Sequence, residues 1–89
     1  MAIMKTDVEA ALKDETAKWL ARLEDAYSRF SPTGKLPEKD LRPVRENIEA
    51  YMKDSRYFSS KGDHMRAFEA AVYAWGLLEA CQHLGVAGK

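Results

Sequence analysis

The sequence predicts a single all-α domain, a three-helix bundle whose last two helices form an antiparallel hairpin. Apolar residues recur at helical spacings of three and four, and no segment shows the strict apolar/polar alternation of a half-buried strand. A proline-containing loop and a Gly-Asp turn divide the 89 residues into three helical segments. A chain of this length makes one domain, so residues 1–89 are expected to share one core.

The first helix is expected over residues 6–30. Thr6 and Glu9 fit a capping box, in which the hydroxyl accepts from the N3 amide and the glutamate reaches back to the cap. Ser31 precedes Pro32, which biases Ser31 away from the helical region and predicts the helix end. The apolar residues of this segment form one stripe around the helix. The stripe contains Val8, Leu12, Trp19, Leu20, Leu23, Ala26, Tyr27 and Phe30.

The second helix is expected over residues 41–60, after a loop at residues 31–40. Asp40 suits the N-cap, and Pro43 would then lie in the first turn, where its missing amide does no harm. A start at Pro37 is an alternative, but it would place Pro43 inside the helix. The apolar stripe of this segment contains Leu41, Val44, Ile48, Tyr51, Met52, Ser55 and Phe58.

The third helix is expected over residues 64–84. Gly62 suits the left-handed residue that follows a helix, and Asp63 suits the N-cap of the next helix. Two helices joined by so short a turn pack as antiparallel neighbours. Gly85 is expected to end the third helix.

The third helix is apolar around most of its circumference. One broad face is expected to fill the core, and it contains Phe68, Ala71, Val72, Trp75 and Leu78. The nearly opposite face contains Tyr73, Leu77 and Leu84, with small residues on the flank between the two faces. In a three-helix bundle both neighbours lie on one side of a helix, so the second face needs a cover. Either another part of this chain covers Tyr73, Leu77 and Leu84, or they bind a protein partner, which includes a second copy of the chain.

Charge and cysteine content narrow the class of protein. Fourteen basic and fourteen acidic residues give a formal net charge of zero, whereas nucleic-acid and membrane-surface binders usually carry a basic excess. The single cysteine, Cys81, excludes an intramolecular disulfide and suits a reducing compartment. The chain shows neither the apolar core of a signal peptide nor a run of about 18 apolar residues. These features favour a cytoplasmic protein.

Polar residues gather at the turn between the second and third helices. They are Asp54, Tyr57, Lys61, His64 and Arg66. They form either a solvated turn or a ligand site that uses the helix N-terminus, where free amides favour anions. The expected cap by the Asp63 carboxylate weakens a phosphate interpretation.

The sequence indicates no catalytic residue, cofactor or metal site. Glu79 and His83 are four residues apart and share a helix face, but two ligands are too few for zinc. Cys81 has no second cysteine in the chain and no evident histidine partner, so it is expected to pack as a small hydrophobe.

Residues 44–84 carry the motifs of a known family. The matching residues are Asp54-Ser55, Tyr57-Phe58, Lys61-Gly62-Asp63, Ala67-Phe68, Tyr73-Ala74, Gly76 and Glu79-Ala80. They resemble the archaeal family of small helical proteins catalogued as domain of unknown function number 357. The resemblance implies a helical bundle of about this size and an archaeal cytosolic protein. It implies no activity, because the family has none established and no assigned catalytic residues.

Two further resemblances set the functional alternatives. The turn at Lys61-Gly62-Asp63 and the segment "AFEAAVYA" are similar to one tetratricopeptide hairpin, which favours a binding protein over an enzyme. Arg56 and His64 are separated by seven residues, one more than in the helical HEPN nucleases they resemble. The main interpretation is a non-enzymatic protein-interaction module that uses residues 64–84. The alternatives are a small ligand-binding protein or enzyme with its site at the turn and, behind it, RNA binding or cleavage.

Overall fold

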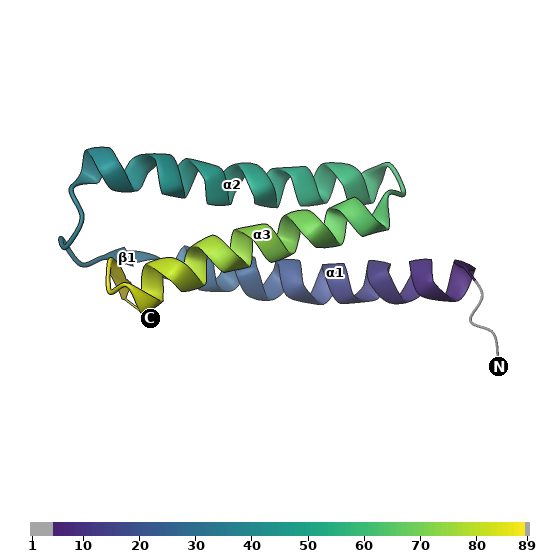
Figure 1. The fold of residues 1–89 in the computed structure, drawn as a ribbon. Coiled ribbons are helices and arrows are strands. Elements are labelled where there is room, and N and C mark those ends of the chain that lie inside the picture. The colour runs from purple at the N-terminus through teal and green to yellow at the C-terminus, as the bar shows by residue number, and fades with distance from the viewer. Residues whose placement is uncertain (1–4, 89) are drawn as a thin grey trace.

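The computed structural model describes residues 5–88, and the side chains of residues 7–88, as three long helices with short connections. α1 spans Lys5–Ser28, α2 spans Glu38–Ser60 and α3 spans His64–His83. α1 and α3 run in the same direction, and α2 runs in the opposite direction (Figure 1). The molecule is elongated, with principal extents of 51 × 23 × 17 Å. The predicted three-helix bundle with a C-terminal helical hairpin is confirmed.

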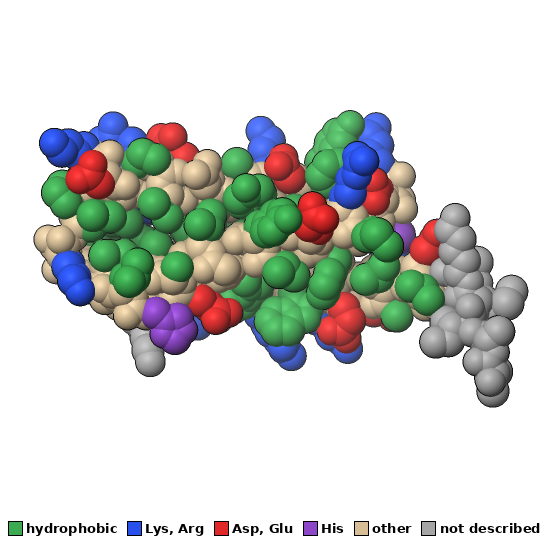
Figure 2. All heavy atoms as spheres, viewed as in Figure 1, with side chains coloured by type: hydrophobic (Ala, Val, Ile, Leu, Met, Phe, Trp, Pro, Cys, Tyr) green, Lys and Arg blue, Asp and Glu red, His purple; other side chains and the backbone are tan. Residues whose placement is uncertain are grey.

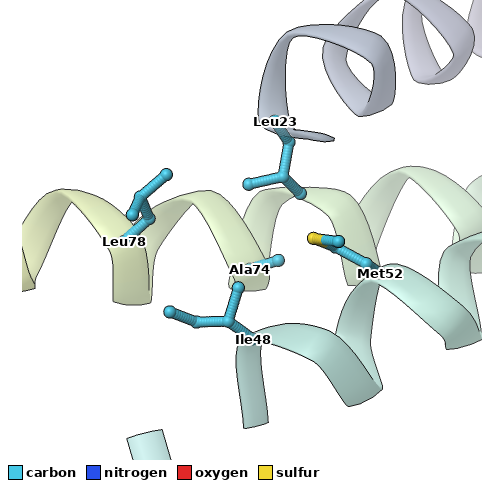
Figure 3. Packing of buried hydrophobic residues seen from close by; sticks show 5 residues of the cluster. All are labelled: Leu23, Ile48, Met52, Ala74 and Leu78. Carbon is cyan, nitrogen blue, oxygen red and sulfur yellow. The ribbon is translucent and has the colours of Figure 1, made fainter. Parts of the chain in front are cut away.

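α3 is the central helix of the bundle. It packs along both α1 and α2, which touch each other over much less of their length. Side chains from all three helices meet in the core (Figure 3): Leu23, Ile48, Met52, Ala74 and Leu78. Polar contacts also join α1 to α2. The Tyr27 hydroxyl donates to the Glu49 carboxylate, and the Arg56 guanidinium pairs with Glu24.

The side of α3 that faces the core is its small-residue flank. The buried residues of α3 are Ala67, Ala70, Ala71, Ala74, Leu78 and Cys81. Because four of these six side chains are single methyl groups, the α3 backbone approaches both neighbouring helices closely. Larger side chains straddle this buried stripe. Phe68 and Trp75 lie against α1, while Tyr73 and Leu77 lie against α2.

The expected burial of the Phe68/Val72/Trp75 face is therefore wrong in part. Val72 is 47% exposed, and Phe68 and Trp75 are half-buried at the α1 seam. Ala71 and Leu78, which were expected on the same face, are buried. The physical reason is that two helices must fit against α3, and only its small-residue flank lets both approach.

The helix ends differ from the predicted boundaries by a few residues. α2 begins at Glu38 with Pro37 as its N-cap, because the Pro37 carbonyl accepts from the amides of Asp40 at 2.9 Å and Leu41 at 3.0 Å. Asp40 is thus inside the first turn and is not the N-cap. Pro43 therefore lies inside the helix, as the alternative start at Pro37 implies, and not in its first turn.

α1 ends at Ser28, two residues before the predicted end at Phe30. The backbone closes in short turns there, since the Arg29 amide donates to Ala26 at 3.2 Å and the Phe30 amide donates to Tyr27 at 2.9 Å. The side chain of Thr6, on which the predicted capping box depends, lies outside the described side chains.

The two glycine turns around α3 are confirmed. Gly62 has a φ of 77°, and the Asp63 carboxylate accepts from the Arg66 amide at 3.2 Å as the predicted N-cap. After α3, Gly85 has a φ of 72° and the Val86 amide donates back to the Cys81 carbonyl at 2.9 Å. This is a Schellman ending, which requires the left-handed residue that glycine supplies.

A short ladder joins the end of the chain to the long loop, and the sequence does not predict it. β1 (Ser31–Pro32) pairs antiparallel with β2 (Ala87–Gly88). The Lys35 ammonium donates to the carbonyl of Leu84, the C-cap of α3, at 2.8 Å. Two-residue strands are too short for an alternating pattern, which explains why no strand was expected.

Ala74→Leu is expected to lower the free energy of unfolding by about 1–3 kcal/mol, because Ala74 is fully buried where the three helices meet. Ala80→Leu, on the exposed side of the same helix, is the matched control and should change it by less than about 0.5 kcal/mol. Urea unfolding followed by circular dichroism measures both. An Ala74→Leu protein as stable as the wild type would contradict the close approach of the helices.

Cys81 is expected to react slowly with a thiol reagent in the folded protein. Its side chain is buried in the α3 stripe, and burial raises the pKa of the Cys81 thiol above its ordinary value of 9.0. The folded state therefore holds the proton more tightly, so this group favours folding below pH 9 and that contribution is lost as the pH rises further. Labelling at pH 8 should be at least about tenfold slower in buffer than in urea. Equal rates would show that α3 does not protect this thiol.

Candidate functional site

α3 exposes a ridge of small and apolar residues on the side opposite its buried stripe. The ridge contains Val72 and Gly76, which lie one turn apart and are both exposed. Figure 2 shows hydrophobic side chains gathered over α3, with acidic side chains among them. The solvent side of a bundle helix is normally polar, so this ridge is the first candidate for a functional surface.

A groove follows the seam between α1 and α3 on one side of the ridge. Its wider half has a volume of about 520 Å³ and is lined by Trp19, Phe68, Val72, Trp75, Gly76, Glu79, Ala80 and His83. Its second half has a volume of about 310 Å³ and is lined by Asp7, Val8, Ala11, Leu12, Glu15 and, again, Phe68. The two halves meet at Phe68 and are together named the α1/α3 groove. Most of its lining is aliphatic or aromatic, which is typical of a site for an apolar ligand or helix.

Trp19 and Trp75 form an aromatic wall in the α1/α3 groove. The Trp75 indole Nε1 donates to the backbone carbonyl of Trp19 at 3.0 Å, and the two rings meet edge to face with centroids 5.9 Å apart. The Arg22 guanidinium lies 5.5 Å from the centre of the Trp19 ring. These contacts hold both indoles in place, so the wall is preformed.

A second recess lies between the ridge and α2, and it holds two of the three predicted partner-binding residues. It has a volume of about 410 Å³ and is lined by Asn47, Tyr51, Val72, Tyr73, Gly76 and Leu77. Tyr73 is 52% exposed, and its ring centroid is 5.5 Å from that of Tyr51. Leu77 is half-buried and packs against the core. Leu84 is exposed at the C-terminal end of α3, outside this recess.

The polar residues of the α2–α3 turn do not line one cavity. Asp54 and Arg66 line a recess of about 300 Å³ between α2 and α3. His64 instead lines a recess of about 170 Å³ against the first turns of α1. The Lys61 ammonium lies 5.6 Å from the ring centre of Tyr57, which is half exposed. The fold thus brings Asp54 and Arg66 together and separates His64 from them.

Two residue pairs singled out in the sequence, one for its resemblance to a nuclease motif and one as possible metal ligands, can be located in the structure. Arg56 is paired with Glu24 on α1, whereas His64 lies in its separate recess. Glu79 and His83 both line the α1/α3 groove. Within residues 5–88, no three His, Cys, Asp or Glu side chains are grouped so as to hold a metal ion. No helix in the same range combines the length and the apolar character needed to cross a membrane.

A family model described as "Protein of unknown function (DUF357)" matches residues 18–87. The chain belongs to the DUF357 family. The resemblance seen in residues 44–84 is thereby confirmed and extended back into α1. The match includes every residue of the wider half of the α1/α3 groove, while most of the second half lies before residue 18.

A solved relative supports the same fold. The crystal structure of a DUF357 protein from Archaeoglobus fulgidus is 39% identical to this chain and has a TM-score of 0.78. The similarity covers 92% of this chain and 97% of that one. No curated protein matches the chain. The comparisons therefore show the family and the fold but indicate no activity.

Sequence reasoning did not identify Trp19, Val72 and Gly76 as groove residues, because it placed the stripes of α1 and α3 in the core. One signal for the groove was present in the sequence. Glycine inside a helix is less favourable than alanine by about 1 kcal/mol. A Cβ at Gly76 would meet nothing within 4 Å, so the packing of this chain does not require glycine there. The missing side chain leaves the surface between the two recesses open.

Gly76→Ala is expected to raise the free energy of unfolding by about 0.4–1 kcal/mol, since the helical backbone accepts alanine and there is room for its methyl group. Gly62→Ala is the matched contrast. It should destabilise the protein, because Gly62 has a φ of 77°, which side chains disfavour. Thermal unfolding of both proteins measures the two effects. Destabilisation by Gly76→Ala would mean that glycine is needed there for folding.

Proposed function

We propose that this DUF357 protein is a non-enzymatic protein-interaction module that docks a partner on the exposed side of α3. The observation that carries the proposal is the ridge at Val72 and Gly76, with an apolar recess on each side of it. Val72 is 47% exposed near the middle of α3, a helix that carries no lysine or arginine after Arg66. Grooves between helices commonly bind an amphipathic segment of another protein. The single buried Cys81 supports a cytoplasmic setting for this interaction.

The lining of the α1/α3 groove favours binding over catalysis. It includes no serine, threonine, cysteine, lysine or tyrosine, and its possible nucleophiles are the His83 imidazole and the carboxylates of Asp7, Glu15 and Glu79. Nucleophilic catalysis needs such a group within hydrogen-bond reach of a base. Glu79 and His83 are the residues of the wider half that could exchange protons. Most of the surface around them is apolar, including the wall of Trp19 and Trp75, which favours an apolar partner over a polar substrate.

The alternative function is the binding of a small ligand in the recess between α2 and α3. Its support is the meeting of Asp54 and Arg66 in one cavity of about 300 Å³. Arg66 is partly engaged already, because its guanidinium Nε lies 3.5 Å from the Asp63 carboxylate. The recess also presents Glu69, so its two carboxylates face one guanidinium and disfavour an anionic ligand. The ridge therefore has the stronger support.

Val72→Lys is expected to abolish capture of the partner without loss of helix content, because it places a charge on an exposed apolar position. Wild-type and variant proteins are immobilised and exposed to lysate of the cells that make the protein. A protein retained by the wild type is then purified, and its direct binding to each variant is measured by sedimentation.

Tyr57→Ser is the matched control, because Tyr57 is also about half exposed but lies on α2 near the turn. It should leave the captured partner bound. Loss of binding with Tyr57→Ser and retention with Val72→Lys would contradict the proposal and favour a site at the turn.

A further inference from the structure

We infer that the partner of the α1/α3 groove is an amphipathic helix whose apolar stripe is flanked by lysine and arginine residues. This inference rests on the proposed function and adds the chemistry of the partner. It is carried by three properties of the groove, namely its length, its apolar floor and the sign of its charges.

The α1/α3 groove has the dimensions of a helix-binding site. Its residues extend from Asp7 and Val8, at the level of the N-terminus of α3, to His83 at the other end of that helix. α3 is 20 residues long, which corresponds to about 30 Å at a rise of about 1.5 Å per residue. A docked helix of about five turns would fit along this seam.

The floor of the groove suits a repeating apolar stripe. Val8 and Leu12 lie at one end, Phe68 lies at the junction, and Val72 and Trp75 continue the surface. An amphipathic helix presents apolar side chains at intervals of three and four residues, which would meet these positions in succession. Gly76 and Ala80 have the smallest side chains in the wider half, so they allow the backbone of a docked helix to come close to α3.

The charges along the groove are acidic. Its ionisable lining residues are Asp7, Glu15, Glu79 and His83, and it is lined by no lysine or arginine. In Figure 2, acidic side chains lie among the hydrophobic ones over α3 as well as at the edges, whereas most basic side chains lie at the edges. A partner with basic flanks would place opposite charges along both sides of its apolar stripe.

Two of these acids, Glu15 and Glu79, have little or no neutralising partner among the described side chains. Glu79 forms no ion pair with the residues that the structure describes. Glu15 lies 3.7 Å from Lys18, but both side chains are more than half exposed, and such surface pairs contribute little. The Arg22 guanidinium lies beside the groove, over the ring of Trp19.

A second copy of α3 fits the groove less well than a basic helix. Glu69 and Glu79 lie on the outward side of α3, on either side of the Val72 and Gly76 ridge. A symmetric antiparallel contact centred on the ridge would bring Glu69 of one copy opposite Glu79 of the other. After Arg66, α3 carries no lysine or arginine that could offset this repulsion.

The test uses two tryptophan-free peptides of about 18 residues, the length of five helical turns. Both carry the same leucine stripe at helical spacing, one flanked by lysine and the other by glutamate. Trp19 and Trp75 are the only two tryptophans of the chain, and both line the groove, so their fluorescence reports binding. At low salt the lysine-flanked peptide should bind about tenfold more tightly, and the difference should shrink as salt is added.

Two variants locate the binding site and its charge. Gly76→Leu should weaken the lysine-flanked peptide at least about tenfold, because the leucine side chain enters open space in the groove while the helix keeps its propensity. The double variant Glu15→Lys/Glu79→Lys should reverse the preference, so that the glutamate-flanked peptide binds more tightly. Asp14→Lys/Glu46→Lys makes the same change in net charge at exposed positions outside the groove and should leave the preference intact.

Each other outcome overturns the inference in a recognisable way. If both peptides bind equally and Gly76→Leu blocks both, the groove remains a docking site. The inferred preference for a partner with basic flanks would then be wrong. Preference for the glutamate-flanked peptide, or no binding of either, would exclude a basic helix, while partner capture with Val72→Lys still judges the proposed function. A dimer in sedimentation that Gly76→Leu breaks would assign the groove to a second copy of the chain.

Discussion

The structure depends on one packing constraint, the alanine stripe along α3. A helix that touches two neighbours at once must present them a narrow surface, and Ala67, Ala70, Ala71 and Ala74 supply it. Once these residues face the core, the direction of every other side chain of α3 is set by the helical period. The aromatic residues fall to the two sides, and Val72 and Gly76 fall on the outside.

The candidate site follows from the same constraint. α1 and α2 pack mostly against α3 and touch each other over a shorter length, where the pair between Arg56 and Glu24 is one of their contacts. Trp75 then reaches sideways to the α1 backbone instead of down into the core. The seam that results is apolar and bordered by acids, with a ridge of small residues beside it. The apolar, acid-bordered surface is thus a consequence of packing two helices against one central helix.

Much of the fold could be predicted from local signals, because its turns use residue types with few alternatives. The two turns around α3 have glycine at their left-handed positions, Gly62 and Gly85, and the N-cap of α3 is Asp63. The start of α2 could not be predicted as well, because it depends on the Pro37 carbonyl accepting two amides. The pairing of β1 with β2 was missed because residues far apart in the sequence meet there.

The site was harder to predict than the fold for a geometric reason. The apolar pattern of α3 allows the core to lie on either of two broad faces. The sequence analysis chose the face with the larger side chains as the core-facing one. The observed solution puts the core between those faces, which makes Val72 a surface residue and Leu77 a partly buried one. Partner residues predicted from the second face, such as Tyr73, therefore lie beside the ridge and not at its centre. In the sequence, Gly76 was the one sign of an open surface. It could be interpreted only once the structure showed that a Cβ at this position would meet nothing within 4 Å.

The parallel course of α1 and α3 also bears on the lifetime of the protein. α2 and α3 meet through a three-residue turn, so their pairing closes little chain and forms early, whereas the Trp75 to Trp19 bond joins residues 56 positions apart. We therefore expect the contact between α1 and α3, on which the groove is built, to form after the hairpin and to open more readily than it. A bound helix would clamp α1 onto the hairpin and slow that opening. Turnover of the protein in the cell would then report whether its partner is present.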